Sequence, residues 1–111
     1  MESRFINDVL KAHGYENRCG GLAMLGTRTA PFRHCHAHLK YDSQGVEYFV
    51  SYYTLVAVRL PDDTLLFNGD TYSVTTTQQI YKWCGIPTAE RRKGMKEGIY
   101  GTFYTHGYNV F

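Results

Sequence analysis

Apolar and polar residues alternate along the middle of the chain, between Arg33 and Thr75. This period of two is typical of β-strands, because successive side chains of a strand point to opposite faces of the sheet. The alternation is strongest over residues 46–60, which are rich in the β-branched and aromatic residues that favour strands. The run is long for one strand, so we expect a bulge or bend near residues 52–54.

Three short segments of turn-forming residues divide this region. Asp42–Gly45 and Pro61–Asp63 have the composition of turns, and Asn68-Gly69 is typical of a two-residue hairpin whose central residues both have positive φ. The strands expected between these turns span residues 33–41, 46–60 and 64–67, with a fourth through Tyr72 and Val74. Consecutive hairpins of this kind predict an antiparallel β-meander of about four strands.

An N-terminal helix is predicted before the strands. Ser3 can cap a helix of about three turns, and Gly14 can end it. Four apolar residues recur at helical spacing within it: Phe5, Ile6, Val9 and Leu10.

One or two further helices are predicted after the strands. A threonine of the run Thr75–Thr77 can cap the first, which Gly85 would end, and its apolar residues Ile80, Trp83 and Cys84 share one face. Thr88 can cap a short basic helix that continues to Lys96, although no apolar stripe marks its inner face. The glycine-rich and aromatic tail can add a strand near residues 108–111.

These elements predict an α+β fold. We expect an antiparallel β-meander of about four strands, with an N-terminal helix and one or two helices after the sheet. The length of 111 residues fits a single domain, residues 1–111. A hydrophobic fraction of 43% and a charged fraction of 20% are those of a globular protein.

The charge balance argues against a dedicated nucleic-acid-binding protein, because the formal net charge is only +2. The charge is nevertheless uneven. Residues 46–81 carry four acidic residues and one arginine, whereas residues 82–111 carry five basic residues and two acidic ones. The basic end of the chain is therefore the part in which a binding surface is expected.

Three features of the sequence indicate a cytoplasmic protein. The cysteines Cys19, Cys35 and Cys84 are odd in number and widely spaced, which argues against a disulfide framework. The N-terminus lacks the apolar segment of a signal peptide, and no apolar run approaches the length of a membrane span. We expect free thiols, and the host-cell cytoplasm as the location.

The residues His34, His36 and His38 are a candidate metal site. On a strand they would project from one face, and two imidazoles can share one zinc ion. Because the outer two diverge on a flat strand, a solvent-facing polar surface is the favoured interpretation. The same alternation sends Cys35 to the opposite face, which removes it as a nucleophile beside these histidines.

The best candidate for a binding surface is the basic segment with the aromatic tail. Basic residues interleaved with rings can hold a nucleic-acid backbone, and Arg and Tyr are also frequent at protein–protein hot spots. The competing interpretation is a solvated helix face followed by a packed C-terminal strand. The candidate partner-binding residues are Arg91, Arg92, Lys93, Lys96, Tyr100, Tyr104 and Tyr108.

Residues 46–85 resemble a family of small uncharacterised phage proteins. The resemblance is carried by a strand motif, Tyr52-x-Thr54-x-Val56-Ala57, and by a strand-to-helix motif, Tyr72-Ser73-x-Thr75-Thr76. Members of that family often carry Ser-Lys-His at the start of the helix, where this chain has Thr77-Gln78-Gln79. No role of that histidine is therefore transferred to this chain. The resemblance implies a phage origin and no established activity.

These observations lead to a functional hypothesis. We expect a non-enzymatic phage accessory protein, without a cofactor, that binds and inhibits a host protein or ribonucleoprotein complex, for example as an anti-CRISPR or other anti-defence inhibitor. One alternative is a small nucleic-acid-binding module that uses the tyrosine-rich strands. Another is a small metal-dependent enzyme that uses the histidine strand.

Overall fold

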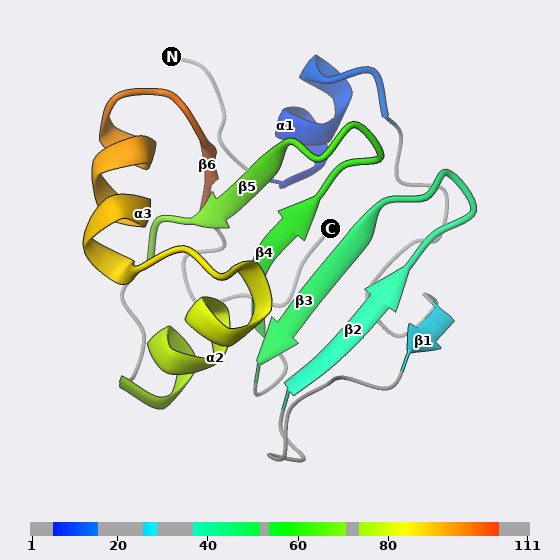
Figure 1. Ribbon diagram of the computed structural model, residues 1–111. Helices are drawn as coiled ribbons and strands as arrows, with labels where there is room; N and C mark the ends of the chain where they lie inside the picture. Colours follow the sequence, from blue (N-terminus) through cyan, green and yellow to red (C-terminus); the bar gives the residue numbers. More distant parts are fainter. Residues whose placement is uncertain (1–5, 16–25, 29–36, 52–53, 71–73, 105–111) are drawn as a thin grey trace.

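A mixed β-sheet forms the centre of the protein, with helices on both of its faces (Figure 1). The computed structural model describes residues 6–15, 26–28, 37–51, 54–70 and 74–104. The strands are β1 Gly26–Arg28, β2 Ala37–Tyr41, β3 Glu47–Ser51, β4 Thr54–Arg59, β5 Leu65–Asn68 and β6 Gly101–Phe103. The helices are α1 Ile6–Ala12, α2 Val74–Cys84 and α3 Thr88–Lys96.

The strands lie in the order β1-β2-β3-β4-β5-β6. Neighbours from β1 to β5 are antiparallel, but β6 pairs with β5 in parallel, with Phe67 opposite Thr102. A parallel neighbour requires a crossover connection, which α2 and α3 provide. The predicted α+β class is thus confirmed, whereas a four-stranded, entirely antiparallel meander was wrong.

The long apolar run over residues 46–60 is a hairpin and not one bent strand. Ser51 of β3 pairs with Thr54 of β4, so the chain reverses between them. The bulge lies further along β4. Phe49 pairs with Ala57 and Val50 with Leu55, which leaves Val56 as the extra residue. Val56 and Ala57 consequently contribute to the same side of the sheet.

The sheet separates two apolar clusters. On one face, Ile6 and Leu10 of α1 pack among buried sheet residues that include Tyr48 and Phe103. On the other face, Ile80 of α2 packs with a second set of sheet residues. The helix α1 therefore covers one side and α2 with α3 the other, as Figure 1 shows.

The turn Asp42–Gly45 was predicted correctly, and its residue Asp42 also accepts a hydrogen bond from a tyrosine of the core. Asp42 Oδ1 accepts hydrogen bonds from the backbone N–H groups of Gln44, at 2.9 Å, and Val46, at 3.1 Å. Its Oδ2 accepts one from the hydroxyl of the buried Tyr48, at 2.9 Å. One carboxylate thereby closes the turn and satisfies the polar end of a core tyrosine.

The turn after β4 was also predicted, and Asp63 adopts a positive φ of 68° there. The hydroxyl and the backbone N–H of Thr64 donate hydrogen bonds to Asp62, and these bonds lower the pKa of that carboxyl. The carboxylate of Asp62 consequently stays ionised as the turn is brought into mild acid.

The predicted hairpin at Asn68-Gly69 was wrong, and so was the fourth strand at Val74, while Tyr72 lies outside the described residues. Neither Asn68 nor Gly69 has a positive φ, and Val74 lies in α2. Asn68 is buried at the end of β5, where its Nδ2 donates to the carbonyl of Leu55 at 2.8 Å and its Oδ1 accepts from the N–H of Asp70. A side chain at Gly69 would overlap the ring of Tyr104, so close packing and not backbone conformation requires this glycine.

The helix ends agree in part with the sequence patterns. The helix α2 begins at Val74, so Thr75–Thr77 lie within it and the predicted threonine cap was wrong. Gly85 follows α2 with a φ of +72°, and α3 spans the predicted residues. The N-cap of α3 is Pro87, without a side-chain hydrogen bond, so Thr88 is the first helical residue and not the predicted cap. The helix α1 has seven residues, fewer than the predicted three turns, and the proposed cap Ser3 lies outside the described residues.

Candidate functional site

The predicted partner-binding residues lie in two different environments. Arg92, Lys93 and Lys96 are exposed on α3, whereas Arg91 of the same helix is only 2% exposed. Tyr100 and Tyr104 are half-buried, and Tyr108 lies outside the described residues. The basic segment is therefore an exposed surface with one arginine turned into the protein.

Arg92, Lys93 and Lys96 share one side of α3, because residues three or four apart on a helix are neighbours. The helix ends at Lys96, Gly98 follows its C-cap with a φ of +78°, and the N–H of Ile99 donates to the carbonyl of Gly94 at 2.8 Å. This cap leaves Ile99 66% exposed, more than Tyr81 or Tyr41. We call Arg92, Lys93, Lys96 and Ile99 the α3 surface.

Of the three histidines of the candidate metal site, the structure describes only His38. His38 is exposed on β2 and flanked by the buried Ala37 and Leu39, as the alternation predicted, while His34 and His36 lie outside the described residues. Among the residues that the structure describes, no three His, Cys, Asp or Glu side chains are grouped to hold a metal ion. Cys84, with a free thiol, is half-buried on α2.

Four aromatic rings meet between the sheet and the two C-terminal helices. Trp83 of α2 packs edge-on against Phe49 of β3, with ring centroids 5.5 Å apart, and against Phe67 of β5, at 6.5 Å. Phe67 also packs edge-on against Tyr100, at 5.4 Å. Such pairs add about 0.5–1.5 kcal/mol each to the burial of their surface. We call these four residues the aromatic cluster.

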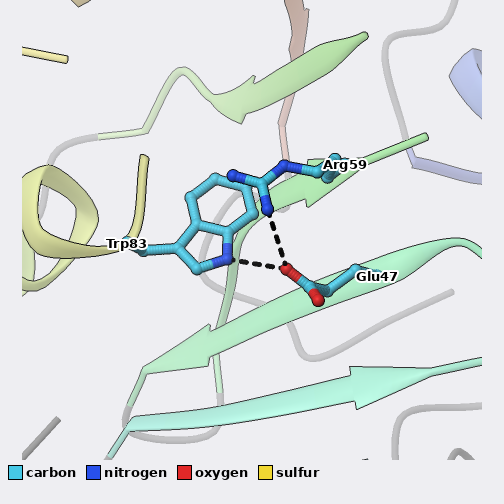
Figure 2. A network of polar contacts seen from close by, with 3 residues as sticks. All are labelled: Glu47, Arg59 and Trp83. Carbon is cyan, nitrogen blue, oxygen red and sulfur yellow. Dashed lines mark hydrogen bonds and ion pairs between the residues drawn. The ribbon is translucent and has the colours of Figure 1, made fainter. Parts of the chain in front are cut away.

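Two arginines stack on this cluster, and the first is paired with a carboxylate. The guanidinium of Arg59 lies 4.7 Å from the centre of the Trp83 ring and 3.5 Å from Glu47 Oε1 (Figure 2). The same oxygen accepts a hydrogen bond from Trp83 Nε1 at 2.9 Å. Glu47 and Arg59 are cross-strand partners, so this network joins β3, β4 and α2.

The second arginine, Arg91, has no such partner among the described residues. Its guanidinium lies 5.6 Å from the centre of the Phe67 ring. Its Nε and Nη1 atoms are buried and receive no hydrogen-bond acceptor from the part of the chain that the structure describes. Gly94, one turn later on the same face of α3, lies directly under the ring of Tyr100.

A buried polar group joins α2 to the end of β3. The hydroxyl of Ser51 donates to Gln79 Oε1 at 2.7 Å and lies 3.1 Å from the hydroxyl of Thr76. Within the described ranges, the Nε2 atom of Gln79 has no hydrogen-bond partner. These three side chains include no general base, so their arrangement favours positioning of α2 over nucleophilic chemistry.

Sequence patterns alone could not identify the aromatic cluster or the pairing of Glu47 with Trp83, because both depend on how α2 docks on the sheet. The sequence did contain one signal for the buried side of α3. Arg91, Gly94 and Met95 follow the i, i+3, i+4 spacing of an inward face, but the first two are not apolar residues.

The network in Figure 2 makes a first testable prediction. Replacing Glu47 with leucine should lower the free energy of unfolding by about 1–2 kcal/mol, because it leaves the indole N–H of Trp83 and the charge of Arg59 without their acceptor. Glu47→Gln keeps an acceptor oxygen and should cost less than about 1 kcal/mol. Urea unfolding of both variants measures the difference, and equal losses would contradict the role of the hydrogen bond.

None of the described helices is long and apolar enough to cross a membrane.

Comparisons with known proteins place the chain in a family. Neither the curated proteins nor the solved structures include a match to this chain. A family of unknown function, DUF8033, matches residues 22–100, which include the whole aromatic cluster and Arg91. Since this match covers more than half of its length, the chain belongs to the DUF8033 family.

Proposed function

We propose that this protein is a non-enzymatic phage accessory protein that binds and inhibits a host protein or ribonucleoprotein complex through the α3 surface. An anti-CRISPR or other anti-defence inhibitor is the specific form of this proposal. The observation that carries the binding role is the exposure of three cations beside an isoleucine that is 66% exposed. An apolar side chain beside cations suits a partner with an acidic surface, where charge steers the encounter and apolar contact adds affinity.

The position of α3 supports this use. The helix α3 is the second helix of the crossover between β5 and β6, and its buried side rests on the aromatic cluster (Figure 1). A packed helix fixes the backbone positions from which these side chains project, so binding does not have to order the backbone. The sequence resemblance to phage proteins supports the origin, and the cationic surface supports an acidic or RNA-containing target.

The test is affinity purification from a bacterial host lysate with three forms of the full chain. These are the wild type, a variant in which Arg92, Lys93 and Lys96 are all changed to glutamate, and a control with Lys11→Glu and Lys82→Glu. The control changes exposed lysines on α1 and α2. We expect the wild type and the control to retain the same partner and the triple variant to bind it at least about tenfold more weakly.

The salt dependence gives a second readout. Affinity of the wild type for the recovered partner should fall as ionic strength rises, and the triple variant should show a flatter dependence. Recovery of no partner, or equal recovery by the triple variant, would refute the proposal. Fluorescence anisotropy with short single-stranded oligonucleotides separates it from direct nucleic-acid binding, which would give tight, salt-sensitive binding without any host protein.

A further inference from the structure

Arg91 is a buried cation that no anion of the described residues neutralises. It is 2% exposed, and neither Nε nor Nη1 has an acceptor within that part of the chain. Burial of an unpaired charge is strongly unfavourable unless another group compensates it. The ring of Phe67, 5.6 Å away, contributes a cation–π contact but does not supply a hydrogen-bond acceptor.

Both arginines stack on the aromatic cluster, but only Arg59 is paired with a carboxylate among the described residues. Arg59 stacks on Trp83 and has the carboxylate of Glu47 at 3.5 Å. Arg91 stacks on Phe67 in the same cluster, where the described residues provide no carboxylate. The contrast with Arg59 indicates which chemistry would satisfy Arg91: an oxyanion like that of the Glu47 side chain.

The unpaired atoms also indicate the shape of that group. A guanidinium offers two edges to oxyanions, a side-on edge that includes Nε and an end-on edge formed by the two Nη atoms. Because neither Nε nor Nη1 of Arg91 is paired within the described residues, each edge still has a donor available. Carboxylates and phosphates fit these edges with two parallel hydrogen bonds.

The half-buried Tyr100 lies beside this position. Its ring packs edge-on against Phe67, the same ring on which Arg91 stacks, and it rests on Gly94 of α3. Tyr100 and Arg91 therefore contact the same ring, and Tyr100 also lies on the helix turn that follows Arg91.

We propose that Arg91, beside Phe67 and Tyr100, forms a binding site for an oxyanion, either a phosphate or a carboxylate. The site lies on the inner side of α3, opposite the α3 surface, so it does not depend on partner binding at that surface. A bound oxyanion neutralises the guanidinium and ties α3 to the sheet. At oxyanion concentrations above the Kd, the free energy of unfolding therefore rises with the logarithm of the oxyanion concentration.

The experiment is thermal unfolding of the full chain at constant ionic strength, with inorganic phosphate replacing chloride in steps and acetate in a parallel series. We expect phosphate to raise the Tm of the wild type by about 4 °C or more at about tenfold its Kd. Arg91→Met should abolish the rise, because methionine fills the space without a charge. Arg92→Met, a matched change of the exposed neighbour, should keep it. A response to acetate and not to phosphate would assign the site to carboxylates, and a response to both would make it a site for either oxyanion.

Two results would overturn the proposal. One is a Tm of the wild type that responds to neither anion beyond the response to chloride. The other is a response of Arg91→Met equal to that of the wild type. Should Arg91→Met not fold, Arg91→Lys replaces it, since lysine keeps the charge but lacks the two-pronged donor and should bind phosphate more weakly in calorimetry. Equal calorimetric binding by the wild type and Arg91→Lys would then count against the site.

Discussion

Replacing Phe67 with alanine is expected to lower the free energy of unfolding by about 3–5 kcal/mol. Phe67 is completely buried, and it packs against Trp83, Tyr100 and Arg91 at once. Its removal leaves a cavity beneath α2 and α3 and takes away the ring that faces the guanidinium of Arg91. Small domains have a total stability of about 5–15 kcal/mol, so the variant should be marginally folded.

Urea unfolding followed by circular dichroism measures this loss. The matched control is Tyr81→Ala, which removes a ring that is 48% exposed on α2 and should change the stability by about 0.5 kcal/mol or less. A loss below about 2 kcal/mol for Phe67→Ala would mean that the helices do not depend on the aromatic cluster. A loss of similar size for Tyr81→Ala would mean that the surface of α2 is packed against something else.

Sequence patterns predicted those helices and strands whose formation depends mainly on residues close together in the chain. Alternation identified β2, the turn residues before and after β5 delimited that strand, and Gly85 and Pro87 placed the end of α2. The same reasoning failed at the hairpin between β3 and β4. Tyr52-Tyr53 lacks the Gly, Asn or Pro that usually marks a two-residue turn, so the sequence predicted a bulge or bend there and not a reversal of the chain.

The parallel strand β6 was missed for a different reason. Gly101–Phe103 has only three residues, and its pairing with β5 spans the whole of α2 and α3. No short-range pattern reports a partner so distant in sequence, and a glycine at its first position weakens the strand signal further. Gly101 is needed there because a side chain would overlap Leu66 of the neighbouring strand.

The candidate site was predicted in part. The run from Glu90 to Lys93 is uniformly charged, so composition indicates one exposed basic face. The helix divides that run, with Arg92 and Lys93 exposed and Arg91 buried against Phe67. The difference depends on the rotation of α3 about its axis, which the docking of Gly94 against Tyr100 determines.

The contact between Gly94 and Tyr100 leads to the second large effect. Gly94→Ala should lower the free energy of unfolding by about 1–3 kcal/mol, because a side chain at this position would overlap the Tyr100 ring. The sign of this change distinguishes the contact from helix propensity. Alanine is the better helix former by about 1 kcal/mol, so in a helix without the Tyr100 contact the same substitution would stabilise the protein. A stabilised Gly94→Ala protein would show that Tyr100 does not lie on α3.

A double-mutant cycle with Tyr100→Ala isolates the cause. Once the ring is removed, the added methyl group has room, and Gly94→Ala should become neutral or stabilising by up to about 1 kcal/mol. The coupling energy from urea unfolding of the four proteins should then be about 1–4 kcal/mol. Additive effects would contradict the contact. Tyr100 packs against Phe67, the ring on which Arg91 also stacks. The rise in Tm with phosphate, measured for the same four proteins, therefore tests whether the Tyr100 ring limits access to the guanidinium.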